Sequence, residues 1–146
     1  MTTEKTTKTA GFSDAERAAM KERAAELRAQ KGGRKKANGL EDLLASIEKM
    51  PDEDRVLAER IHAIVTDVAP ELEAKTWYGQ PAWAKDGKVV CFFHSAAKYE
   101  TRYATFGFND VEEIESGSMW PTSFSLTAIG DAEAKEIAAL VRKLVD

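Results

Sequence analysis

Three runs of sequence decide the fold: Trp77-Tyr78-Gly79-Gln80-Pro81-Ala82-Trp83, Lys88–His94 and Arg102–Phe108. They hold eight of the twelve aromatic residues of the chain, and Gly, Pro and Asp separate them. Aromatic and β-branched residues favour strands, and the links between the runs are too short for the crossovers that parallel strands need. The sequence therefore predicts an antiparallel sheet in this part of the chain.

Strands are expected on both sides of short turn signals. Asp86-Gly87 predicts a two-residue hairpin, because glycine tolerates the positive φ that a type I′ turn requires. The predicted strands are Lys75–Tyr78, Ala82–Ala84, Lys88–His94, Thr101–Phe106 and Thr122–Leu126.

Helical periodicity flanks the strands. Before them, we expect a short helix through Leu40–Ile47 and a longer one, with Pro51 in its first turn, that ends at Pro70. After them, Gly130-Asp131 begins a helix whose apolar face runs to Val145. The order of helices and strands predicts an α+β fold, an antiparallel sheet with helices packed on one face.

Alternation along the strands assigns side chains to the two faces of this sheet. The side expected to pack against the helices consists of Cys91, Phe93, Ala104, Phe106, Phe124 and Leu126. The side expected to remain open consists of Phe92, His94, Tyr103, Thr105, Ser123 and Ser125. The open side mixes rings with hydrogen-bonding groups, which is typical of a binding surface and also of a simple solvated sheet face.

Residues 1–37 form a basic arm ahead of a domain at 38–146. Residues 1–40 carry ten Lys and Arg against five Asp and Glu, so +5, and residues 41–146 carry eleven against twenty, so −9. We expect disorder in residues 1–12, a helix from the capping box Ser13-Asp14-Ala15-Glu16 to about Gln30, and a flexible basic linker at Lys31–Lys36. The linker could touch nucleic acid, but the acidic domain would repel the phosphates, so a nucleic-acid partner is not expected.

The sequence predicts a protein that neither spans a membrane nor is exported. No run approaches the ~18–20 apolar residues that span a bilayer, so no membrane partner is expected. The start of the chain does not resemble a signal peptide, and the single Cys91 cannot form an internal disulfide. We therefore expect a cytoplasmic protein.

Several signatures along the chain resemble the YdhG-like family, a domain-of-unknown-function group. They are Trp77-Tyr78-Gly79-Gln80-Pro81, Lys88–Phe93, Lys98, Arg102–Phe108 and Trp120-Pro121, and the resemblance covers roughly Leu40 to Val145. It implies a frataxin-like fold, with the N-terminal helix as an extension seen in some members. It also implies a mostly unassigned activity, although iron chaperoning has been proposed for some members.

Two candidate binding sites follow. Iron carried by a frataxin-like protein would use exposed acids of the first long helix, of which Asp52 and Glu59 lie closest to one line. A small anion would bind instead on the open sheet face, where rings supply area and cations select charge. The residues predicted for that site are Phe92, His94, Tyr103 and Trp83 or Tyr78, with Lys98 and Arg102 at its edge.

We expect a non-enzymatic binding protein, for either labile iron or a small anionic ligand. Ser95-Ala96-Ala97-Lys98 matches a Ser-x-x-Lys motif, but it follows a strand and lacks the accompanying catalytic elements, so no catalytic residue is predicted. Two alternatives remain open. One is an enzyme or stress-response factor using the open sheet face, and the other is an interaction module that docks on nucleic acid or a protein through the basic arm.

Overall fold

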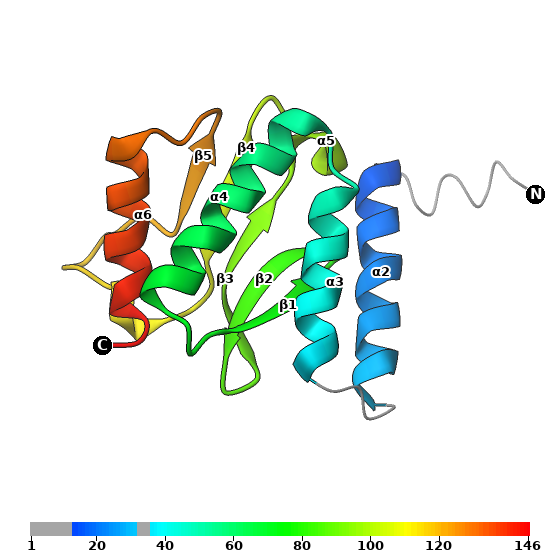
Figure 1. The fold of residues 1–146 in the computed structure, drawn as a ribbon, viewed down its shortest axis with the longest axis horizontal. Coiled ribbons are helices and arrows are strands. Elements are labelled where there is room, and N and C mark those ends of the chain that lie inside the picture. Colours follow the sequence, from blue (N-terminus) through cyan, green and yellow to red (C-terminus); the bar gives the residue numbers. More distant parts are fainter. Residues whose placement is uncertain (1–12, 32–35) are drawn as a thin grey trace, which may run out of the picture.

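The computed structural model describes residues 13–31 and 36–146, and these form an α+β fold (Figure 1). The helices are α2 (Asp14–Lys31), α3 (Lys36–Glu48), α4 (Asp52–Val68), α5 (Ala96–Tyr99), the short 3-10 helix η1 (Glu112–Ile114) and α6 (Asp131–Lys143). The strands are β1 (Glu73–Trp77), β2 (Gln80–Lys85), β3 (Lys88–His94), β4 (Ala104–Phe108) and β5 (Ser123–Leu126).

The described strands make one five-stranded sheet in the order β1-β2-β3-β4-β5, and every neighbouring pair is antiparallel. The predicted antiparallel sheet is therefore confirmed. The bounds of β3 match the prediction, and β4 begins three residues later than expected because α5 and a turn precede it.

Two tight turns connect the first three strands. Asp86 (φ 52) and Gly87 (φ 81) join β2 to β3, as the sequence predicts. Tyr78 (φ 55) and Gly79 (φ 75) join β1 to β2 with the same pair of left-handed residues. The sequence predicts Tyr78 at the end of a strand, so this second hairpin was not expected.

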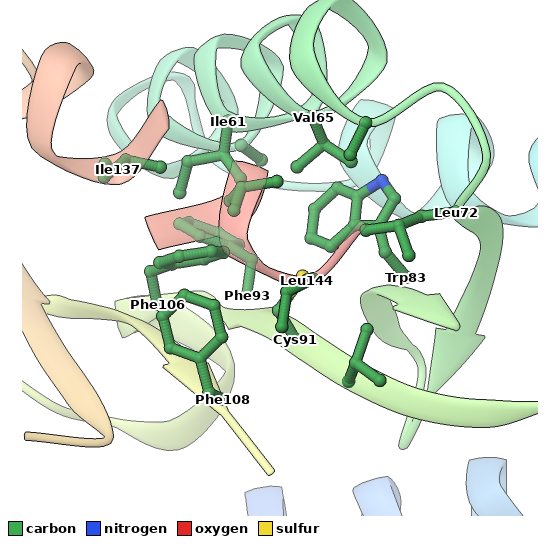
Figure 2. Packing of buried hydrophobic residues seen from close by; sticks show 14 of the residues in the cluster. Ile61, Val65, Leu72, Trp83, Cys91, Phe93, Phe106, Phe108, Ile137 and Leu144 are labelled. Carbon is green, nitrogen blue, oxygen red and sulfur yellow. The ribbon is translucent and has the colours of Figure 1, made fainter. Parts of the chain in front are cut away.

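The core lies between one face of the sheet and helices α4 and α6 (Figure 2). The strand residues predicted to face the helices are buried, except that Phe124 is only partly buried against the same cluster. From α4 and α6, the residues Ile61, Val65, Ile137 and Val141 complete the layer. Each large side chain buried here contributes about 1.5–3 kcal/mol to folding.

Helix α3 closes the β1 end of this core. It contributes Leu43 and Ile47 to the buried cluster, and Met50 follows just after the helix. The helix approaches β1 so closely that a Cβ on Gly39 would collide with the backbone carbonyl oxygen of Ala74. A residue without a side chain is therefore required at this contact.

Helix α2 lies on the other side of the sheet. Figure 2, in which α4 lies above the sheet, shows turns in the blue of α2 below it. Its Arg23 and Glu26 act electrostatically on Lys75, which shares a sheet face with Trp77 and Phe92 through the β1–β2–β3 register. Helices therefore do not pack on one face alone, and the N-terminal extension covers part of the face expected to be open.

The predicted capping box begins α2 as expected. The Ser13 amide donates to Glu16 Oε1 at 2.8 Å, and the Glu16 amide donates to Ser13 Oγ at 3.0 Å. The expected disorder of residues 1–12 and most of the expected linker at Lys31–Lys36 lie outside the described residues. Across 13–31 and 36–146, no helix is both long and apolar enough to span a bilayer.

Candidate functional site

The tip of the β1–β2 hairpin holds a carboxylate. The amides of Tyr78 and Gly79 donate to Oε1 and Oε2 of Glu26, each at 3.1 Å. Both residues adopt the left-handed conformation, and successive amides in such a turn form a concave nest that binds anions. We call these two amides the hairpin nest.

Lys98 lies beside the hairpin nest and pairs with a second carboxylate of α2. Its ammonium forms an ion pair with Glu22, and only 18% of the Lys98 side chain is exposed. Burial lowers the pKa of Lys98 from its usual value. Because a buried cation is stable only with a compensating anion, this position favours a negative group next to it.

Two side chains accept hydrogen bonds from the N-terminal amides of helix α5, which carries Lys98. Ser95 Oγ accepts from the Lys98 amide at 3.2 Å, and Asp54 accepts from the amides of Ala96 and Ala97 at 3.0 Å each. Asp54 is 5% exposed, on the same face of α4 as Leu57 and Ile61. This role of Asp54 was not predicted, although the helical period places the residue on the apolar face of α4.

Gln80 ties the hairpin to α5. Its Oε1 accepts from the Ser95 amide at 2.8 Å, and its Nε2 donates to the Gly79 carbonyl at 3.2 Å. The side chain is buried with both ends bonded, so it holds the hairpin nest and the start of α5 at a fixed separation.

A cavity of about 600 Å³ lies between α2, α3, this hairpin and α5. Lys49 and Lys98 are the cations among its lining residues, and its acids are Glu22, Glu26 and Asp42. Ser46, Thr76 and Gln80 add neutral polar groups. This open cavity therefore presents charges of both signs to a bound molecule.

An aromatic cluster lies on the sheet face away from the core: Trp77, Tyr78, Phe92, His94 and Tyr99. The His94 ring stacks on Trp77 and on Tyr99, with centroids 5.9 and 4.6 Å away. Desolvation lowers the pKa of His94 to about 4, and its buried Nε2 has no hydrogen-bond partner. This imidazole is therefore neutral at physiological pH.

The structure brings together only some of the residues predicted for an anion site. Tyr78, Phe92 and His94 share the aromatic cluster, and Lys98 lies next to the cavity. Trp83 was wrongly placed: it is 1% exposed in the core, because its partner across the sheet is Cys91 whereas Ala82 pairs with Phe92. One position along a strand reverses the face, and a bulge between Trp83 and Ala84 causes that shift of one position.

Tyr103 and Arg102 lie apart from the cluster. Both are exposed ahead of β4, and the Arg102 guanidinium lies 5.9 Å from the centre of the Tyr103 ring. Neither lines the 600 Å³ cavity. The predicted surface therefore divides into a cluster near α2 and an exposed pair at the start of β4.

The acids predicted for iron are solvent-exposed on α4. Asp52 Oδ1 accepts from Arg55 at 2.6 Å, and Glu59 lies two turns further along the helix. Within the part of the chain that the structure describes, no three His, Cys, Asp or Glu residues are grouped so that they could hold a metal ion.

Ser95 caps the start of helix α5, so the Ser-x-x-Lys motif does lie at a helix start, which the sequence did not predict. Its hydroxyl accepts from the Lys98 amide as an N-cap, and the Lys98 ammonium pairs with Glu22. The two side chains therefore have structural partners other than each other. The sequence missed α5 because a four-residue helix is too short to show a period.

The chain matches no family model, no curated protein and no solved structure.

Proposed function

We propose that this protein binds a small organic anion in the cavity between α2, α3, the β1–β2 hairpin and α5. The observation that carries the proposal is a cavity of about 600 Å³ with the mostly buried Lys98 in its wall. Small-molecule sites typically measure roughly 300–1,000 Å³ and use a few placed polar groups to orient the ligand.

The charges on the cavity wall narrow the ligand class. Lys98 and Lys49 supply positive charge for a carboxylate or phosphate group. Asp42 supplies acceptors for hydroxyl or amino hydrogens elsewhere on the same molecule. The proposed ligand is therefore a small polar metabolite that carries at least one carboxylate or phosphate group.

Binding rather than catalysis is the better account of these residues. His94 stacks on two rings and burial lowers its pKa to about 4, so it is a poor proton carrier at neutral pH. The Ser95 hydroxyl caps α5. The order α4, five antiparallel strands, α6 supports the further proposal that the domain is frataxin-like and YdhG-like.

An NMR titration of the full chain tests the binding proposal. A panel of hydroxy acids, amino acids, dicarboxylates and sugar phosphates should contain a compound that shifts the amides of Ser46, Gln80 and Lys98. Lys49→Ala and Lys98→Ala should each weaken that binding about tenfold, as expected when a charged partner is lost. Lys88→Ala is the matched control, because Lys88 donates to the Asp110 carbonyl and does not line the cavity.

Two results would contradict the proposal. One is a panel in which no compound shifts the cavity amides. The other is equal weakening by Lys88→Ala and by the two cavity variants, since that would indicate a nonspecific charge effect. Thermal melts of each variant separate lost binding from lost folding.

A further inference from the structure

We propose that the hairpin nest is a carboxylate subsite of this cavity, and that Glu26 occupies it as an internal competitor. A ligand carboxylate replaces Glu26 on the amides of Tyr78 and Gly79 and releases α2 from the sheet. This inference rests on the proposed function, because it assigns the ligand class and the regulation of the same cavity.

The hairpin nest is built independently of α2. Tyr78 and Gly79 hold left-handed φ angles of 55° and 75° within a two-residue hairpin, and the β1–β2 ladder fixes that turn. Gln80 anchors the same turn to α5. The two amide donors therefore keep their direction when Glu26 leaves, and any carboxylate of suitable reach can accept from both.

One helix blocks both anion-binding groups. Glu22 pairs with Lys98, and Glu26 occupies the hairpin nest one turn later on the same face of α2. Movement of α2 therefore uncovers the Lys98 ammonium and the two amides together. A ligand with two carboxylates about one helical turn apart satisfies both, which points to a small dicarboxylate.

The described contacts between α2 and the rest of the molecule are of a kind that a ligand can replace. Among its described side chains only Ala19 is buried, whereas Glu22, Arg23 and Glu26 are partly exposed. Within the described residues, α2 contributes no side chain to the hydrophobic core cluster. The described contacts of α2 are therefore mainly polar, and elements held by few apolar contacts are among the first to open.

Gly79 lies directly beside the Glu22 side chain. A Cβ at this position would meet the Glu22 carboxylate, which is the end of a flexible side chain and can move aside, whereas the φ of 75° favours glycine by itself. The turn therefore requires the glycine, and the Glu22 carboxylate lies next to it. Glu26 competes with the ligand in the free protein. The apparent affinity is therefore the intrinsic affinity multiplied by the fraction of molecules in which the hairpin nest is free.

Glutarate is the probe, and its neutral diamide, glutaramide, is the matched compound. Both are titrated into the full-length protein and its Glu26→Gln variant while the amide signals of Tyr78 and Gly79 are followed by NMR. Glutarate should bind Glu26→Gln about tenfold to a hundredfold more tightly than the native chain, because a charged competitor has been removed. Glu41→Gln, an equal charge change at an exposed position of α3 outside the cavity, should leave the affinity unchanged.

Hydrogen exchange supplies a second readout. Saturating glutarate should speed the exchange of α2 amides in the native protein, and glutaramide should not. If Glu26→Gln destabilises the whole chain, Glu26→Asp keeps the charge but shortens the reach, and it should give a smaller gain in affinity.

The outcomes separate this inference from the proposed function. Equal or weaker glutarate binding in Glu26→Gln overturns the competition by α2. Shifts at Ser46 and Gln80 without shifts at Tyr78 and Gly79 overturn the nest subsite but keep the cavity as the binding site. No shift of any cavity amide with glutarate overturns the dicarboxylate assignment, and the wider panel then decides whether the cavity binds another anion.

Discussion

His94 is a titratable side chain enclosed by rings, and this gives the protein a pH-dependent stability. An unfolded histidine titrates near pH 6.5, whereas the folded His94 titrates near 4. Between these values the unfolded chain binds more protons, so the free energy of unfolding falls as pH falls from about 7 to 4. The contribution of His94 is complete above pH 6.5 and is lost toward pH 4, with an upper limit of about 3 kcal/mol.

Urea unfolding between pH 4 and 7.5 measures this effect. His94→Gln should flatten the profile, since glutamine does not titrate. His62→Gln is the comparison, because burial also lowers the pKa of His62, which stacks on Trp83 in the core. A His94→Gln profile as steep as that of the native protein would show that His94 is not the source of the pH dependence.

Cys91 should be chemically inert in the native protein. It is fully buried beneath α4 and α6, and burial raises the pKa of its thiol far above the usual range. Because the thiolate is the reactive species, a water-soluble thiol reagent should label Cys91 only as fast as the protein unfolds. Labelling kinetics in increasing urea check this, and rapid labelling in buffer alone would show that β3 opens locally.

Single residues also show how well the sequence predicts which face of the sheet a side chain lies on. Alternation on β3 predicted the opposite faces of Phe93 and His94 correctly, because neighbours on a strand must diverge. The same alternation, continued from the Asp86-Gly87 hairpin without interruption, puts Trp83 opposite Val90 and therefore on the face of Phe92. A bulge between Trp83 and Ala84 shifts the register by one residue and turns Trp83 into the core, and the sequence pattern shows no sign of that bulge.

At the scale of elements, Asp54 is the residue that joins α4 to α5. Its carboxylate accepts from the amides of Ala96 and Ala97, and it is nearly inaccessible to solvent. Asp54→Ala should therefore lower the free energy of unfolding by about 1–3 kcal/mol, as expected when buried donors lose a charged acceptor.

Chemical denaturation measures the loss, and Asp52→Ala is the matched control. Asp52 is an exposed acid in the same first turn, and it pairs with Arg55 across the helix surface. Such exposed pairs contribute about 0–1 kcal/mol. If the two variants lose the same stability, the acids act through the helix dipole alone and the link to α5 is not stabilising.

Elements with several turns or several alternations were predictable, and short or irregular ones were not. The strand β3 and the helix α4 each contain enough apolar residues to show their period. The four-residue α5 and the Tyr78-Gly79 turn depend instead on a cap and on backbone conformation. The conformation of these two elements is held by contacts with Asp54, Gln80 and Glu26, and the local sequence does not predict those contacts.

At the scale of the whole molecule, the candidate site depends on contacts between distant segments. Glu26 and Tyr78 are 52 residues apart, and Asp54 and Ala96 are 42 apart. Hydrophobic pattern predicts that helices cover a sheet, but it does not say where a mostly polar helix such as α2 will dock. The sequence therefore predicts an open sheet face where the structure has this polar helix beside an aromatic cluster.

Removal of residues 1–35 tests how far the domain depends on that helix. The core cluster is formed by α3, α4, α6, the sheet and the segments that join them, and no described side chain of α2 belongs to it. We therefore expect the truncated chain to unfold cooperatively, with about 1–3 kcal/mol less stability from the lost hydrogen bonds to Glu26. The amides of Tyr78 and Gly79 should exchange with solvent faster than in the full chain, whereas the Ala96 and Ala97 amides held by Asp54 should not.

A chain lacking only residues 1–12 is the control for shortening alone. Loss of the cooperative transition on removing residues 1–35 would mean that α2 is an obligatory layer of the fold, and an obligatory layer could not act as an exchangeable competitor for the hairpin nest.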